Sequence, residues 1–263
     1  MNTLINRLYG NYLMPSRLQH YEELLRHAAH AGYCQTSIRA FFRSIADIDF
    51  FERKVVVHRH DVDSDVRTAK KIFDIEKKHG VHSTFYFRLS TLDFNFMREI
   101  DEYGSEASYH YEEIATFAKK NNIRNSEEIY TRLREIRLDF ANNFDYVQEK
   151  LCGKLATVAS HGDFVNRQLA IPNTEILNDG NLRKDCGIEC ESYDRTLLDK
   201  FDIYITDRPY PEYFHPISPV NAIGFHKKIC VLTHPMQWET NWLENTKTNS
   251  VRFYEGLVWK LTR

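Results

Sequence analysis

The sequence lacks the glycine-rich loop ending in Lys-Ser or Lys-Thr that cradles phosphate groups, and glycine is scarce, with 10 in 263 residues. This absence argues against a phosphate-binding NTPase. The strand-turn-helix nucleophile elbow of many serine and cysteine hydrolases is also missing. No run of about 18 apolar residues occurs, and the N-terminus has no apolar stretch of signal-peptide length. We therefore expect a soluble, cytoplasmic protein with no membrane span.

Neither sign of charge is in excess, because 35 Lys and Arg residues stand against 37 Asp and Glu residues, a formal net charge of −2. Without a basic excess, we expect no nucleic-acid partner. Cysteine is also scarce, and its five scattered positions suit a reducing compartment. Cys186 and Cys190 form a C-x3-C pair with no second pair to complete a zinc site, so we interpret them as ordinary thiols.

Strands alternate with helices along the chain, judged by apolar periodicity and β-branched runs. Strands are expected at 54–58, 82–87, 106–109, 155–159, 201–206 and 228–233, and helices at 21–30, 64–79, 94–103 and about 125–151. Gly80 and Gly104 are expected to end two of these helices. The alternation predicts an α/β fold with a mostly parallel sheet. No linker divides the chain, so we expect a single domain over 1–263 with an N-terminal helical segment over about residues 1–50.

The most informative stretch is residues 55–63, VVVHRHDVD, in which an apolar β-branched run leads directly into histidines and carboxylates. Asp61 and Asp63 are two residues apart, so in extended backbone both point to the same side. Two such carboxylates repel each other unless a cation, a shared proton or a basic partner relieves them. Divalent cations relieve such pairs well, which indicates a metal site. The plainer interpretation is that one of them caps the helix expected from Ser64.

Polar side chains also follow the other predicted strands. The carboxyl ends of parallel strands meet at one rim of an α/β fold, and active sites are built there. Taken singly, each residue fits a structural role, such as a backbone-bonded core histidine for His110 or a turn residue for His161. Together they favour an enzyme site. The side chains are Asp61 and Asp63, His110 and Glu112, His161, Asp207, and His234.

Five motifs stand in a fixed order along the chain: His60-Asp61-Val62-Asp63, STFYF at 83–87, GSEASYHYE at 104–112, Ser160-His161-Gly162, and Thr233-His234-Pro235 with Trp238. As a set they resemble the polysaccharide deacetylase family, over about residues 21–238. The resemblance implies a distorted (β/α) barrel with about seven parallel strands. It also implies a divalent metal, usually zinc, and removal of N- or O-acyl groups from a carbohydrate substrate.

Carried over residue by residue, the resemblance implies that Asp61 is the base and His234 the general acid. It implies that Asp63 and His110 bind the metal. Asp207 is our candidate for the carboxylate that holds a histidine in the required tautomer.

The sequence departs from the family at two places. The family usually has a second metal-binding histidine four residues after the first, where this chain has Ile114. His161 is our candidate replacement, and Glu112 is the alternative. The family's arginine-bearing third motif is absent, and Ser160-His161-Gly162 stands in its approximate place.

Two other functions remain open. Asp61-Val62-Asp63 is also a D-x-D motif of the kind that holds a metal against a nucleotide sugar in glycosyltransferases, although it leaves the histidines unexplained. The absence of a histidine at Ile114 is also compatible with a barrel that has lost catalytic activity and serves as a binding or structural module. For a deacetylase without a secretion signal, we expect a precursor of a surface polysaccharide as the substrate.

Overall fold

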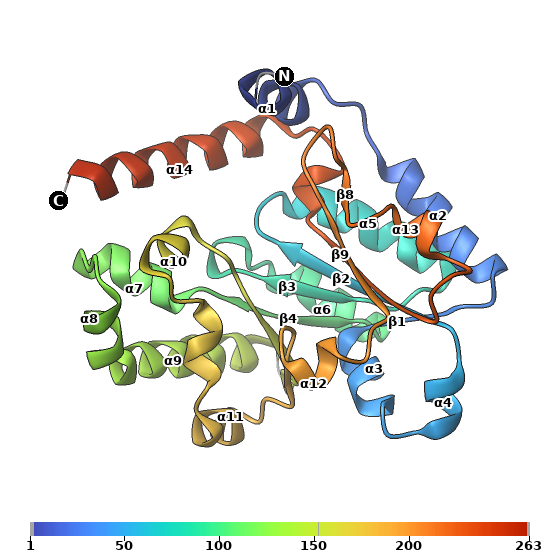
Figure 1. Ribbon diagram of the computed structural model, residues 1–263, viewed down its shortest axis with the longest axis horizontal. Coiled ribbons are helices and arrows are strands. Elements are labelled where there is room, and N and C mark those ends of the chain that lie inside the picture. The colour runs from blue at the N-terminus through green and yellow to red at the C-terminus, as the bar shows by residue number, and fades with distance from the viewer. Residues whose placement is uncertain (1–2, 152, 262–263) are drawn as a thin grey trace.

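The computed structural model describes residues 3–151 and 153–261, and a curved, mostly parallel sheet forms its centre (Figure 1). Within these residues the sheet has nine strands in the order β6-β5-β4-β3-β2-β9-β7-β8, and β1 pairs with the first part of β2. The pairings of the described strands are parallel except that of β7 with β8. The strands are β1 (Cys34–Thr36), β2 (Val55–Val62), β3 (Thr84–Phe87), β4 (Glu106–Tyr111), β5 (Thr157–Ser160), β6 (Cys190–Glu191), β7 (Ile203–Asp207), β8 (Phe214–His215) and β9 (Lys228–Thr233). The predicted distorted (β/α) barrel is confirmed, in the form of an open half-barrel.

Helices cover the outer face of this sheet and its ends (Figure 1). The α-helices are α1 (Thr3–Tyr12), α2 (Leu18–His30), α3 (Ile38–Ser44), α4 (Ile48–Glu52), α5 (Val66–His79), α6 (Phe94–Tyr103), α7 (Glu113–Asn121), α8 (Ser126–Thr131), α9 (Leu133–Leu151), α10 (Phe164–Leu169), α11 (Gly180–Cys186), α12 (Arg195–Leu198), α13 (Pro219–Ala222) and α14 (Trp242–Leu261). Three short 3₁₀ helices are η1 (Leu89–Thr91), η2 (Asn173–Leu177) and η3 (Pro235–Gln237). None of the helices in the described ranges is long and apolar enough to cross a bilayer.

Strand β2 lies inside the sheet and is buried along its whole length. Its residues alternate between two apolar clusters: Val56 belongs to the large core under the outer helices, and Val57 to a smaller core on the other face. The predicted end of this strand at His58 is wrong, because the strand continues to Val62. Pairing with β9 as far as His60 and with β3 as far as Val62 satisfies the backbone of these polar residues.

The helix after β2 is capped by Asp65, whose side chain accepts a hydrogen bond from the backbone N–H of Thr68. The structure therefore gives the capping role to neither Asp61 nor Asp63. Gly80 and Gly104 end α5 and α6 in the left-handed conformation, as predicted.

Two further predictions need correction. The long helix expected from about 125 to 151 is two helices, α8 and α9, separated at Arg132. The segment over residues 1–50 is mostly helical, but it also contains β1, which pairs with β2. The single-domain organisation stays a prediction.

Candidate active site

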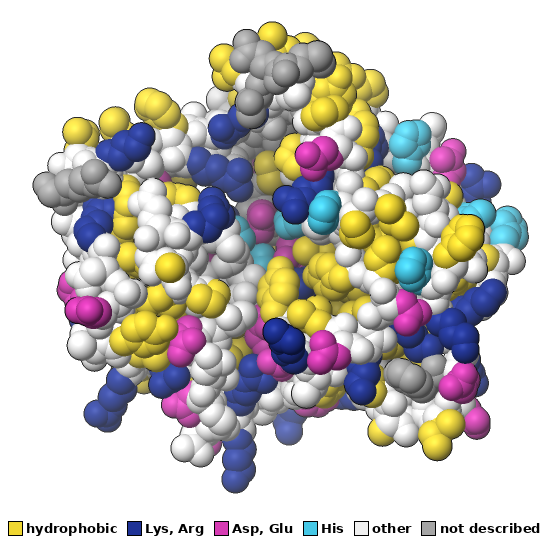
Figure 2. All heavy atoms as spheres, in the orientation of Figure 1, with side chains coloured by type: hydrophobic (Ala, Val, Ile, Leu, Met, Phe, Trp, Pro, Cys, Tyr) yellow, Lys and Arg dark blue, Asp and Glu magenta, His cyan; other side chains and the backbone are white. Residues whose placement is uncertain are grey.

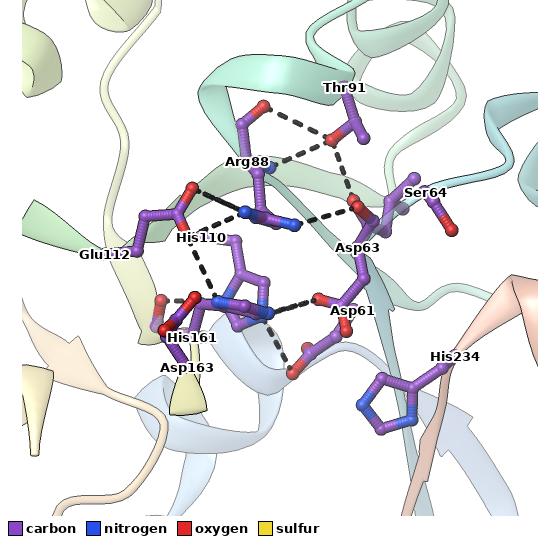
Figure 3. A network of polar contacts seen from close by, with 12 residues as sticks. Asp61, Asp63, Ser64, Arg88, Thr91, His110, Glu112, His161, Asp163 and His234 are labelled. Atoms are coloured by element: carbon purple, nitrogen blue, oxygen red, sulfur yellow. Dashed lines mark hydrogen bonds and ion pairs between the residues drawn. The ribbon is translucent and has the colours of Figure 1, made fainter. Parts of the chain in front are cut away.

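Side chains that follow neighbouring parallel strands meet at one rim of the sheet (Figure 3). Asp63 follows β2, Arg88 follows β3, Glu112 follows β4, His161 follows β5 and His234 follows β9. The strands are parallel, so their carboxyl ends lie side by side, and residues far apart in the sequence become neighbours. Asp61 and His110 lie near the ends of β2 and β4 and join the same group.

Asp63 lies between two imidazoles. Its Oδ1 atom is 3.3 Å from Nε2 of His110 and 3.5 Å from Nε2 of His161. This oxygen is buried, and neither contact is aligned well enough to give it a hydrogen-bond partner. Ligands about 2.0–2.2 Å from a tetrahedral zinc ion are about 3.3–3.6 Å from one another. Both distances therefore match those between ligands of a shared zinc ion.

The outer nitrogen of each imidazole faces an acceptor, through a hydrogen bond in His110 and through an ion-pair contact without hydrogen-bond geometry in His161. Nδ1 of His110 donates a hydrogen bond to the carbonyl oxygen of Ala159, at 2.9 Å. Nδ1 of His161 lies 3.2 Å from a carboxylate oxygen of Glu112. Arg88 holds that carboxylate through its guanidinium, with Nη2 at 2.8 Å and 2.7 Å from the two oxygens. In both rings the remaining nitrogen, Nε2, faces Asp63, which is the orientation that metal binding needs, and Nε2 of His110 also lies 3.4 Å from Oδ2 of Asp61.

Asp63, His110 and His161 nevertheless do not form a complete metal site as they are placed. In the part of the chain that the structure describes, no group of three or more His, Cys, Asp or Glu side chains could hold a metal ion without adjustment. The rings of His110 and His161 stand nearly perpendicular, with centroids 5.2 Å apart. The two contacts of Asp63 thus have the spacing of zinc ligands, but the three side chains must rearrange as a set before they could hold a metal ion. The chemistry of the donors fits zinc, with two imidazoles and one carboxylate.

Asp61 has a basic partner that the sequence analysis did not identify. The guanidinium of Arg59 binds it through two hydrogen bonds, Nε to Oδ1 and Nη2 to Oδ2, both 2.8 Å long. Both residues are buried, and Arg59 also donates to the hydroxyl of Tyr204 at 3.1 Å. Burial raises the pKa of Asp61, but the charge and hydrogen bonds of Arg59 together with the charges of His110 and His234 outweigh that effect and hold the pKa below its usual value. Asp61 is thus a fixed carboxylate, ionised at neutral pH.

Charges at the rim compensate one another. Burial alone would raise the pKa of Asp63, and the facing His161 holds it well below its usual value. Burial would likewise lower the pKa of His161, and Asp63 and Glu112 raise it to about 9. Without a metal, Asp63, His161 and Glu112 therefore form a charged cluster in which a proton takes the place of a cation.

His234 is held by Asp207 from the neighbouring strand β7. Nδ1 of His234 donates to Oδ1 of Asp207 at 2.6 Å, and the His234 backbone N–H donates to Oδ2 at 2.7 Å. Trp238 Nε1 donates to the same Oδ2 at 2.9 Å. Burial lowers the pKa of His234, and the Asp207 carboxylate more than offsets this and raises it to about 9. Figure 3 shows the imidazole facing Asp61 and Asp63 across the gap at the rim.

Ile114, which stands where the resemblance implies a second metal-binding histidine, has a structural role. Ile114 is fully buried in the main core, and its backbone N–H donates to Asn173. His161 instead lies beside Asp63, while Glu112 contacts Arg88 and the far nitrogen of His161. The geometry thus favours His161 over Glu112 as the third ligand, although the ligand assignments themselves stay predictions.

The sequence analysis missed Arg59 and Arg88. Arg59 is two residues before Asp61 in extended backbone, so spacing alone places both side chains on one face. Arg88 directly follows β3, the same position that singled out the other rim residues. Both signals were present in the sequence. The described thiols, Cys34, Cys186, Cys190 and Cys230, are free, and burial raises the pKa of Cys186 to about 11, which agrees with their interpretation as ordinary thiols.

A cavity of about 780 Å³ opens at the rim between α7 and α14. Asp63, His161, Arg88 and Glu112 line its inner end, and side chains of α14 line its outer wall. Figure 2 shows this hollow near the centre of the view, with His and acidic side chains inside it. Its volume suits a small ligand such as a short carbohydrate.

No protein-family model and no curated protein match the sequence. Among solved structures, the Streptococcus pyogenes deacetylase PplD, in complex with acetate, is 15% identical with a TM-score of 0.40, over 58% of this chain and 68% of that one. The CE4 family pseudoenzyme BA3943 of Bacillus anthracis is 16% identical with a TM-score of 0.38, over 77% of this chain. This chain spans 62% of the BA3943 chain, less than two thirds of it.

The peptidoglycan deacetylase PdaC of Bacillus subtilis is 12% identical with a TM-score of 0.33, over 79% of this chain and 98% of that one. These three solved structures are two deacetylases and a CE4 family pseudoenzyme, each at low identity to this chain.

Proposed function

We propose that the protein is a metal-dependent deacetylase that removes an N- or O-acyl group from a carbohydrate. One observation carries the proposal: a buried carboxylate oxygen, Oδ1 of Asp63, has no hydrogen-bond partner and faces Nε2 of two histidines from different strands. Without a metal, only ion-pair contacts to the two imidazoles compensate this oxygen, and a shared cation would take the place of the proton on His161.

Asp63, His110 and His161 would hold the metal, and two imidazoles with one carboxylate are a ligand set that suits zinc. When bound, the ion would acidify a water molecule and polarise the acyl carbonyl. Glu112 would keep the proton on Nδ1 of His161, and Arg88 would fix Glu112. These contacts leave Nε2 of His161 free of other partners on the side that faces Asp63.

Asp61 would accept the proton of the attacking water. Its two oxygens accept one hydrogen bond each from Arg59 and retain further lone pairs. Because Arg59 contributes to a lowered pKa, Asp61 is ionised at neutral pH, and Arg59 fixes its orientation.

His234 would protonate the departing amine or hydroxyl of the sugar. A general acid must carry a proton at the working pH, and Asp207 raises the pKa of His234 to about 9. Because Nδ1 is bonded to Asp207, the proton available for transfer is the one on Nε2. A precursor of a surface polysaccharide stays the proposed substrate.

The alternatives are less well supported by the same geometry. A glycosyltransferase D-x-D site needs both carboxylates free for a metal and a diphosphate. Here Arg59 donates a hydrogen bond to each oxygen of Asp61, and a D-x-D site gives no role to the histidines at the same rim. A non-catalytic barrel would keep the cluster of Asp63, His161 and Glu112 as a structural ion group. Metal uptake distinguishes that case from the enzyme.

Release of acetate from N-acetylglucosamine oligomers and from O-acetylated glycans, with added zinc, tests the proposal. We expect acetate release by the native chain and loss of at least about a hundredfold in Asp61→Asn. Asp74→Asn makes the same chemical change on the exposed side of α5 and should keep the native rate. Equal rates in the native protein and Asp61→Asn would remove Asp61 from its role.

A further inference from the structure

Helix α14 has its apolar side turned away from the protein. A surface helix normally packs its apolar stripe on the core. In α14 the buried side chains are Asn245 and Trp259, whereas five large apolar residues are exposed. These are Trp242 (63%), Leu243 (83%), Phe253 (74%), Leu257 (44%) and Leu261 (74%). With about 100° between successive residues, all five fall within about one third of the helix circumference.

This stripe continues to the mouth of the cavity. Val251, Tyr254 and Val258 are also exposed, and they line the cavity that contains Asp63 and His161. Apolar side chains thus extend from the outer side of α14 to the opening of the candidate active site, with Thr246, Lys247, Ser250 and Lys260 standing among them.

Helix α1 extends the same surface. Leu4, Ile5, Leu8 and Leu13 are at least half exposed. Helix α1 packs against α14, where Asn245 donates a hydrogen bond to the carbonyl of Asn11 at 2.6 Å. Figure 2 shows apolar side chains at the top and upper left of the molecule, over α1 and α14. We call this surface the α1–α14 face, formed by Leu4, Ile5, Leu8, Leu13, Trp242, Leu243, Val251, Phe253, Tyr254, Leu257, Val258 and Leu261.

The charges of these two helices are mostly basic. Arg7, Lys247, Arg252 and Lys260 stand against Glu244 and Glu255 within the bounds of α1 and α14. Glu255 is bonded to Lys119 of α7. The local charge is therefore positive, whereas the whole chain has a net charge of −2. Apolar and aromatic side chains bordered by Lys and Arg are the composition of helices that lie in the interface of an anionic membrane.

We propose that the α1–α14 face docks on the surface of an anionic lipid bilayer, with both helices lying in the interface. This position turns the cavity mouth toward the lipid headgroups. A self-complementary contact between two copies of the chain is disfavoured, because twofold symmetry brings the same basic side chains of both copies to one interface. The inference stands on α1 and α14 and does not depend on the proposed catalysis.

Sedimentation with large vesicles tests the docking. The vesicles are phosphatidylcholine alone or phosphatidylcholine with about one third phosphatidylglycerol. The full chain should sediment with the anionic vesicles, and less so as salt is raised. The triple change Leu243→Ser, Phe253→Ser and Leu261→Ser should lower the partition coefficient by at least about tenfold. All three positions are highly exposed in the free chain, so the fold should be unaffected.

The control is a second triple change, Ile48→Ser, Leu138→Ser and Phe225→Ser, at exposed apolar positions away from the face. It should bind vesicles like the native chain. Absence of binding to anionic vesicles, or equal loss in both triple variants, would overturn the proposal. Sedimentation equilibrium without lipid tests the alternative that a second copy of the chain binds the α1–α14 face. A dimer that only the α14 variant dissociates would assign the face to a second copy instead.

Discussion

Replacing Asp207 by Asn should move the basic limb of the pH–rate profile. In the native protein the Asp207 carboxylate raises the pKa of His234 to about 9, against an ordinary value of 6.5. His234 acts as an acid only while protonated, so activity should fall as pH rises through about 9. Without the carboxylate charge, burial lowers the pKa and only the Asp63 and Asp61 charges oppose it, so the pKa should fall to the ordinary value or below it. The loss of activity should then begin at least about two pH units earlier.

The magnitude follows from the protonated fraction. At pH 8, a group with a pKa of about 9 is roughly 90% protonated, and one with a pKa of about 6.5 roughly 3%. The variant should therefore be about thirtyfold less active at pH 8 relative to its own maximum. At pH 6 the protonated fractions should differ by less than about twofold. The assay is acetate release as a function of pH at saturating substrate.

The shape of the profile is the informative quantity, because the absolute rate will also fall. Asp207 accepts from the backbone and ring of His234 and from Trp238, and an amide cannot accept all three hydrogen bonds. Trp238→Phe removes one of these donors while keeping the carboxylate, so its basic limb should stay near pH 9. An unshifted basic limb in Asp207→Asn would refute the assignment of His234 as the acid that Asp207 controls.

Three further predictions concern stability and metal affinity. Arg59→Met should lower the free energy of unfolding by about 3–5 kcal/mol in urea titrations, because it leaves the Asp61 carboxylate buried without its partner, and adding Asp61→Asn should recover most of the loss. Glu112→Gln should weaken zinc binding by about 10- to 100-fold in calorimetry through loss of the contact to His161, and unchanged affinity would exclude this support. Gly104→Ala should destabilise by about 1–2 kcal/mol in thermal unfolding, because its φ is 96° and a new Cβ would meet His82 at 3.3 Å, whereas Gly256→Ala, in open space within α14, should not.

The sequence predicted most of the sheet and the rim residues for a simple reason. Apolar β-branched runs mark buried strands, and the polar residues after them lie on one edge because the strands are parallel. Asp63, His110, His161, Asp207 and His234 were found in this way. The end of β2 was predicted too early because the apolar β-branched run ends at Val57, whereas the strand continues through polar residues to Val62. In the folded chain, partners on neighbouring elements satisfy these groups: His60, for example, bonds Glu76 and Thr233.

Other features depended on tertiary contacts that no local pattern records. Spacing places Arg59 and Asp61 on the same face of β2, but it does not show their bidentate hydrogen bonding. Contacts of Arg59 with Tyr193 and Tyr204 help to fix that geometry. Helix α14 was not anticipated. Its apolar stripe faces outward, so it does not belong to the core pattern on which the other helices were predicted.

Zinc titration of chelator-treated protein, followed by calorimetry, tests the central claim most directly. The native chain should bind one zinc ion per molecule, and Asp63→Asn should lose that binding, because Oδ1 of Asp63 is the atom that faces both imidazoles. Failure of the native chain to take up zinc, or equal uptake by Asp63→Asn, would contradict the account.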